Sequence, residues 1–217
     1  MPDFAQQRRN MVEAQVRADG VRDERLLEAM LAVPRERFIP AARSALAYAD
    51  VPAEVAPRRF LLDPRSFGKL AELAAIKAED RILDVGMATG YSSAVLAKLG
   101  KRVTALEQDA DLVRIASDSL QRTDARNATV MQGGLAEGAK AEVPFDVIFV
   151  NGAIEAEPQR LLAQLAEGGR LVAVIQTGVL GRAHLFIREN GTISVKPGFD
   201  ASVPVLAGFR APAGFVF

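Results

Sequence analysis

The fold of this chain is decided by the stretch Ile82-Leu83-Asp84-Val85-Gly86-Met87-Ala88-Thr89-Gly90-Tyr91. A short apolar run ends in an acidic residue, and a turn of small residues then leads directly into residues 91–97, which have the composition of a helix. A buried strand that turns tightly into a helix N-terminus is where open α/β sheets bind nucleotide-like ligands. The stretch therefore predicts a strand, a ligand-binding turn and a helix.

The spacing of small residues in this turn indicates which kind of nucleotide it binds. A dinucleotide fingerprint needs glycine at its first, third and sixth positions, where this chain has Gly86, Ala88 and Tyr91. Small residues stand instead at the first, third and fifth positions, the last being Gly90. That spacing is typical of S-adenosylmethionine-dependent methyltransferases, so a dehydrogenase is disfavoured.

An acidic residue at the end of the next expected strand supports the same ligand. This strand, expected over residues 102–107, ends at Glu107, and a carboxylate there can accept hydrogen bonds from both ribose hydroxyls. The alternative is an ordinary strand-turn-helix followed by a solvated glutamate. We expect S-adenosyl-L-methionine as cofactor, bound by Asp84, Gly86, Ala88, Gly90, Glu107 and Gln108.

Composition limits the other chemistries open to the chain. It has 217 residues, enough for one domain with a full core, and its 27 basic and 27 acidic residues give no net charge that would attract nucleic acid or an anionic membrane. The absence of cysteine excludes thiol catalysis and zinc–cysteine sites. The single histidine, His184, lies in an apolar run and is expected to be partly buried and structural, so no metal is expected. No signal peptide or membrane span is recognisable, so a cytoplasmic location is expected.

From residue 81 onward, strands and helices are expected to alternate. Near-continuous apolar strands of this kind indicate a parallel sheet covered on both faces. The fold class is therefore α/β, a doubly wound, mostly parallel, Rossmann-like sheet; Asn190-Gly191 predicts an antiparallel hairpin at its C-terminal end. Strands are expected at 81–86, 102–107, 128–132, 145–150 and 170–176, and helices at 90–99, 110–122 and 157–166, the last closed by Gly168-Gly169.

The first part of the chain is expected to be an N-terminal helical extension, residues 1–78, attached to an α/β core of residues 79–217 in one domain. Asp23, Asp63 and Asp109 each precede a helical pattern and are expected to be N-caps. Between the first two of these helices, several prolines predict an irregular segment.

The residues suit methylation of a carboxylate. Methyl transfer from a sulfonium is a displacement in which the cofactor carries the reactivity. A carboxylate, with an ordinary pKa of about 4, is already ionised at neutral pH and needs no general base. The protein then mainly aligns donor and acceptor, which a chain without cysteine can do.

The N-terminal half carries a more specific resemblance. The motifs are Met11–Val16, Gly20–Met30, Val33–Pro40 and Ala47–Asp50, continued by Asp84–Tyr91, Pro144–Ile148, Leu165–Val172 and Val203–Leu206. Over nearly its whole length the chain resembles protein-L-isoaspartate O-methyltransferases. The resemblance implies esterification of the carboxylate of isoaspartyl residues in damaged proteins, after which the ester collapses to a succinimide and allows partial repair. It also implies a protein or peptide substrate and, we expect, a monomer.

The chain departs from the family pattern at three places. The family's Gly-Gln-Thr-Ile-Ser-x-Pro loop, whose hydroxyls lie at the substrate end of the cofactor, corresponds to Arg58–Pro64, with Phe60 and Leu62 in place of Thr and Ser. The family's Gly-Asp-Gly, whose Asp contacts adenine, corresponds to Gly133-Gly134-Leu135, and the resemblance implies that these three residues also bind the cofactor. The central turn glycine is Ala88. No catalytic residue is assigned; the candidate substrate loop is Phe60, Leu62, Asp63 and Ser66.

Three interpretations therefore stay open at this point. The chain is an active methyltransferase of this family, a methyltransferase whose substrate has shifted because the loop is apolar, or a non-catalytic descendant that binds the cofactor or a protein partner.

Overall fold

The computed structural model of the chain describes residues 3–210. Its centre is a seven-stranded sheet with the order β5-β4-β3-β6-β7-β8-β9. The strands from β5 to β7 are parallel, and β8 and β9 continue the sheet in antiparallel pairs. The bounds are β3 Arg81–Val85, β4 Arg102–Glu107, β5 Ala128–Gln132, β6 Phe145–Ile154, β7 Leu165–Thr177, β8 Leu180–Glu189 and β9 Thr192–Asp200. The predicted α/β fold class and its C-terminal hairpin are confirmed.

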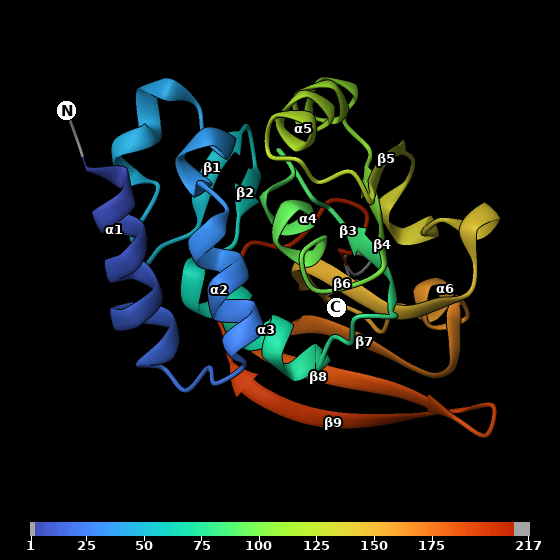
Figure 1. The fold of residues 1–217 in the computed structure, drawn as a ribbon. Coiled ribbons are helices and arrows are strands. Elements are labelled where there is room, and N and C mark those ends of the chain that lie inside the picture. Colours follow the sequence, from blue (N-terminus) through green and yellow to red (C-terminus); the bar gives the residue numbers. More distant parts are fainter. Residues whose placement is uncertain (1–2, 211–217) are drawn as a thin grey trace, which may run out of the picture.

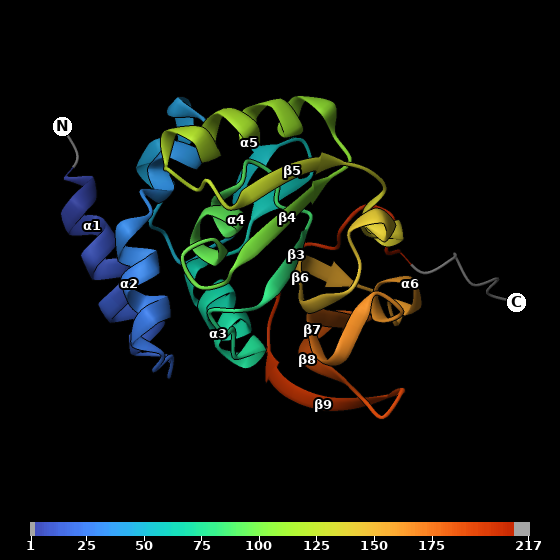
Figure 2. The same cartoon turned by 45° about the vertical axis from the view of Figure 1, so that its right-hand side comes forward.

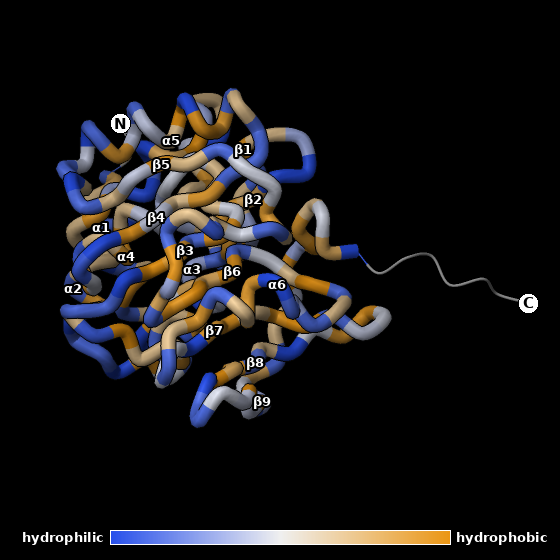
Figure 3. Tube along the Cα trace, turned by 90° about the vertical axis from the view of Figure 1, so that its right-hand side faces the viewer, coloured by the Kyte–Doolittle hydropathy of each residue, from blue (hydrophilic) through white to orange (hydrophobic). Residues whose placement is uncertain are grey.

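Helices cover both faces of this sheet (Figures 1 and 2). Alternate residues of β6 point to opposite faces: Val147 and Phe149 join one apolar cluster, and Ile148 and Val150 join the other. The first cluster includes residues of the helices α1 Phe4–Met11, α2 Glu24–Ala32, α3 Pro64–Ala74, α4 Tyr91–Leu96 and α5 Ala110–Arg122. The second includes residues of α6 Gln159–Leu162. Figure 3 shows the hydrophobic residues concentrated on the central strands. This double burial explains the continuous apolar strands.

The three predicted N-caps are confirmed. Asp23 accepts from the backbone N–H of Arg25, Asp63 from that of Ser66, and Asp109 from that of Asp111. Each carboxylate satisfies a donor that the first helical turn leaves free.

The last predicted helix is wrong in extent. Residues 157–166 form only the short helix α6, which ends at Leu162, and Leu165 already pairs with Phe145 as the start of β7. Gly168-Gly169 does not close a helix: Gly168, with φ 76°, lies at an irregularity inside β7, between residues that pair with Phe145 and with Val147. The prediction failed because the apolar spacing of Leu161, Leu162 and Leu165 suits either structure.

The N-terminal extension is not purely helical. It contains a two-stranded antiparallel hairpin of β1 Ala53–Ala56 and β2 Arg59–Leu61. Besides its α-helices it also has one π-helical segment, Val12–Arg17, and two 3₁₀-helical segments, Arg35–Phe38 and Ala41–Leu46. The turn between these strands is Pro57-Arg58, with Arg58 at φ 59°. Only the later part of the segment expected to be irregular is therefore a hairpin, and it lies between the N-terminal helices and the rest of the molecule (Figure 1).

One buried cation ties this extension together. Arg35 is 1% exposed, and its Nε and Nη2 donate to the carbonyl oxygens of Ala47 (2.8 Å) and Leu62 (2.7 Å). Its guanidinium also lies 4.7 Å from the ring centroid of Tyr91 at the start of α4. Arg35 thus connects the segment before the hairpin, the residue that follows the hairpin, and helix α4.

We expect Arg35→Ala to lower the free energy of unfolding by about 2–5 kcal/mol, because it strands two buried carbonyl oxygens at about 1–3 kcal/mol each. Urea unfolding measures this change. The control is Arg37→Ala, which removes an exposed arginine from the same segment and should change stability by less than about 0.5 kcal/mol. A loss below about 1 kcal/mol for Arg35→Ala would contradict the role given to this residue.

Candidate cofactor and substrate site

The small-residue turn lies at the carboxyl ends of β3 and β4. The backbone N–H of Gly86 donates to the carbonyl oxygen of Leu106 on β4 (2.9 Å), and Gly90 closes the turn on Met87 (2.9 Å). Gly86, Ala88 and Gly90 have φ angles of 76°, 52° and 96°. The left-handed backbone explains the spacing of small residues. At Ala88 this conformation costs roughly 1–2 kcal/mol, because a Cβ is present.

Glu107, at the end of β4, is fully buried and lies against this turn. Its Oε2 accepts from the backbone N–H of Ala88 (3.0 Å), and its Oε1 accepts from those of Gln108 (2.9 Å) and Asp109 (3.3 Å). The guanidinium of Arg59 on β2 completes the set by pairing with Oε2. One carboxylate therefore joins the turn, the end of β4 and the hairpin.

Asp84, at the end of β3, is also fully buried but has only neutral partners. The hydroxyls of Ser92 (2.7 Å) and Ser93 (2.5 Å) donate to its Oδ2, and the side-chain amide of Asn151 donates to its Oδ1. Burial raises the pKa of Asp84 to about 6, against the opposing effect of these three donors. Asp84 thus connects β3 to α4 and to the end of β6.

Asn151 was missed by sequence reasoning. It follows the apolar run of β6 directly, at the same edge of the sheet as Asp84 and Glu107. A polar residue after a buried strand at this edge is the signal that could have identified it.

The candidate substrate loop divides between two places. Phe60 and Leu62 line a cavity of about 10 Å³ together with Gly86, Met87 and Asn151, so the structure brings this part of the loop to the turn. Asp63 and Ser66 do not line that cavity: they cap α3 and border a separate cavity of about 250 Å³.

The remaining predicted cofactor residues surround the end of β5. Gly133 donates to the carbonyl oxygen of Glu107 (2.9 Å), and Gly134 precedes a short 3₁₀ segment that begins at buried Leu135. Leu135 packs near Gly86: a Cβ built on Gly86 would lie 3.6 Å from Leu135 Cδ1 and 3.0 Å from Leu206 Cδ2. The side chain of Gln108 is exposed, and only its backbone N–H bonds to Glu107.

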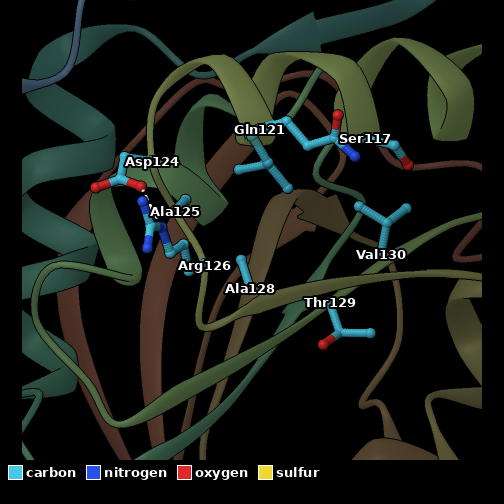
Figure 4. Close-up of a pocket in the computed structure, with 9 residues that line it drawn as sticks. Ser117, Gln121, Asp124, Ala125, Arg126, Ala128, Thr129 and Val130 are labelled. Atoms are coloured by element: carbon cyan, nitrogen blue, oxygen red, sulfur yellow. Dashed lines mark hydrogen bonds and ion pairs between the residues drawn. The ribbon is translucent and has the colours of Figure 1, made fainter.

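A further cavity and the single histidine lie away from the turn. A larger cavity of about 530 Å³ lies between α5 and β5 (Figure 4), but its lining contains none of the predicted site residues. Half-buried His184 is on β8, where its Nδ1 lies 2.9 Å from the carbonyl oxygen of Arg182. Among residues 3–210 there is no group of three or more histidine, aspartate or glutamate side chains that could hold a metal ion. Within the same residues, every helix is too short or too polar to cross a membrane.

Comparison with known proteins identifies the family. The model of the protein-L-isoaspartate(D-aspartate) O-methyltransferase (PCMT) family matches residues 6–204. The chain belongs to this family. A protein-L-isoaspartate O-methyltransferase of Koribacter versatilis is 36% identical over 190 residues, covering 88% of this chain and 86% of the relative. One from Methylorubrum extorquens is 39% identical over 206 residues, covering 91% and 90%.

Solved structures agree on the fold. A structure named protein-L-isoaspartate O-methyltransferase superposes with a TM-score of 0.81 at 23% identity, covering 93% of this chain and 66% of that one. A structure from Plasmodium falciparum, assigned to the same family and in complex with S-adenosyl-L-homocysteine, has a TM-score of 0.79 at 23% identity and covers 92% and 97%. The resemblance predicted from the sequence motifs is therefore confirmed.

The raised pKa of Asp84 leads to a prediction on stability in this PCMT-family chain. A carboxyl whose pKa rises from 3.8 to about 6 on folding stabilises the fold below about pH 4, and that contribution is lost as the pH rises through 6. Asp84→Asn removes the titration. We therefore expect the unfolding free energy of Asp84→Asn, minus that of the wild type, to rise by about 2.4 kcal/mol between pH 4 and pH 7.

Urea unfolding at several pH values measures this difference, in which the titration of all other groups cancels. The matched control is Asp118→Asn on the exposed side of α5, whose stability should run parallel to that of the wild type. A parallel curve for Asp84→Asn as well would show that Asp84 does not titrate in this range.

Proposed function

We propose that this chain is an S-adenosylmethionine-dependent carboxyl O-methyltransferase that acts on isoaspartyl residues of proteins or peptides. The observation that carries the proposal is the family match over residues 6–204, in a chain that has a buried carboxylate near the end of β3, Asp84, and another at the end of β4, Glu107. We expect it to act in the cytoplasm, as a monomer and without nucleic acid.

The residue types at the turn fit the cofactor. Glu107 is a buried carboxylate beside a turn of small residues, and such a carboxylate suits a ribose diol. Two buried nitrogens of Arg59, Nε and Nη1, have no hydrogen-bond partner in the described part of the chain, so the arginine paired with Glu107 is incompletely satisfied and a polar ligand can compete with it for that carboxylate. We infer that Glu107 would hold the ribose, that the turn would lie beside the cofactor, and that residues 133–135 would border the adenine.

The cofactor supplies an electrophilic methyl group when bound. The chain must then orient a substrate carboxylate that is already ionised. Phe60 and Leu62 border the cavity at the turn, and their apolar side chains cannot donate a hydrogen bond to that carboxylate. Asp63 and Ser66 do not supply the missing hydroxyl there, because they lie at the cap of α3.

The apolar loop favours a second candidate, a methyltransferase of the same fold with a less polar substrate. This candidate differs from the isoaspartyl methyltransferase only in the substrate that fits beside Phe60 and Leu62. Transfer of methyl from labelled S-adenosylmethionine to a peptide containing isoaspartate, compared with the same peptide containing aspartate, distinguishes the two functions.

We expect slow transfer by the wild type and at least tenfold faster turnover by the double variant Phe60→Thr with Leu62→Ser. Loss of one polar contact at a reacting centre typically costs about 10²–10³ in rate, so restoring two donors recovers part of this loss. Steady-state kinetics with the isoaspartyl peptide measure the change.

Two controls accompany this measurement. The aspartyl peptide should stay unmethylated by both proteins, and the affinity for S-adenosylhomocysteine should be similar in both, which shows that the double variant is folded. Wild-type turnover equal to that of the double variant would mean that the two hydroxyls are dispensable in this chain.

A further inference from the structure

A buried arginine stands at the carboxylate assigned to the ribose. Arg59 is the first residue of β2, is 7% exposed, and pairs with the fully buried Glu107. At the corresponding loop position the family pattern given above has glutamine, which is shorter and uncharged. The chain therefore places a cation where the family has a neutral side chain.

The acceptor capacity of Glu107 is already used. A carboxylate offers about four lone-pair positions, and Glu107 accepts from Ala88, Gln108, Asp109 and Arg59. Three of these donors are backbone N–H groups of the turn and of the end of β4. Arg59 is the one side-chain donor among the four, so it is the partner that ribose hydroxyls can replace.

The space on the substrate side of the turn is also small. The cavity bordered by Phe60, Leu62 and Gly86 measures about 10 Å³, the size of about one water molecule, whereas pockets for small molecules are usually about 300–1,000 Å³. A ligand that reaches this side of the turn therefore needs Phe60 and Leu62 to move, and these residues follow Arg59 on the same segment.

The hairpin has features that allow this movement. It forms a sheet of its own, separate from the seven-stranded sheet, and a lone two-stranded hairpin has little stability by itself. Two of the three guanidinium nitrogens of Arg59 are buried and have no partner among residues 3–210, which weakens the closed arrangement. The contacts that oppose movement of the hairpin lie at its margins. They are the exposed ion pair Arg43–Glu54 on its outer side and the hydrogen bond from Arg35 to Leu62 just after β2.

We propose that Arg59 is a gate on the cofactor site: it occupies the ribose subsite on Glu107, and the β1–β2 hairpin must swing out before an adenosyl cofactor binds. Arg59 then sets the affinity for the cofactor, which is weaker than the turn and Glu107 alone would give. This inference rests on the proposed function.

The first test is calorimetry with S-adenosylhomocysteine on the full chain. Arg59→Gln removes the charge that holds the gate closed, and its dissociation constant should fall at least tenfold below that of the wild type. Arg59→Lys keeps a cation opposite Glu107 and should bind no more tightly than the wild type. The matched control is Arg58→Gln, which removes an exposed charge from the same hairpin and should leave the affinity unchanged.

The outcomes separate the gate from the proposed function. Equal or weaker binding by Arg59→Gln would overturn the gate and leave the proposed function standing, because Arg59 would then be an ordinary ligand contact or a structural residue. Tighter binding by Arg59→Gln supports both. Absence of binding by the wild type and by Arg59→Gln at millimolar ligand would overturn both.

A second test uses the wild-type protein alone and does not depend on a variant's stability. Arginine modification by phenylglyoxal, located by mass spectrometry, should spare Arg59 in free protein and reach it when S-adenosylhomocysteine is bound. Exposed Arg58 should react in both samples and serves as the internal standard. Continued protection of Arg59 in the ligand-bound sample would overturn the gate.

Discussion

The carboxylate of Glu107 is the constraint on which the turn, the end of β4 and the hairpin all depend. A fully buried charge is tolerated only when it is paired and hydrogen-bonded, and Glu107 meets this condition with three backbone donors and one arginine. The bond to Ala88 holds the turn against β4, and the ion pair draws the hairpin over the same edge of the sheet. The candidate cofactor site is thus organised by one residue at a strand end.

Asp84 and Glu107 are neighbouring buried carboxyl groups with different partners. Both stand at the carboxyl ends of adjacent parallel strands and both are fully buried. Glu107 faces a cation, whereas Asp84 faces two hydroxyls and an amide. Hydroxyls and amides stabilise a carboxylate less than a guanidinium does, so burial dominates at Asp84 and raises its pKa. Asp84 therefore serves to join β3, α4 and β6, and Glu107 is the residue suited to a ligand.

Most of the fold was predictable because its signals are local. Apolar runs gave the central strands, and aspartates before helical patterns gave three caps. The failures have two causes. Leu165 belongs to β7 because a partner from another part of the chain, Phe145, lies beside it. Residues 53–61 form a local hairpin although Pro52 precedes it and Pro57 lies in its turn. At the site, the turn and Glu107 were recognisable from spacing. The partner of Glu107 was not, since Arg59 lies 48 residues earlier and only the folded hairpin brings the two together.

Three of the departures from the family pattern lie on this one hairpin or on the residue that follows it. Arg59 and Phe60 belong to β2, and Leu62 follows its last residue, so the cation paired with Glu107 and the apolar side chains that border the turn are parts of one short segment. Whatever moves Arg59 away from Glu107 also moves Phe60 and Leu62 relative to the turn, because at most two peptide units separate each of them from its neighbour in this group. With the gate proposed above, cofactor entry and the shape of the substrate end are mechanically linked. The replacements at Arg59, Phe60 and Leu62 then act as one change to one segment and not as three independent losses.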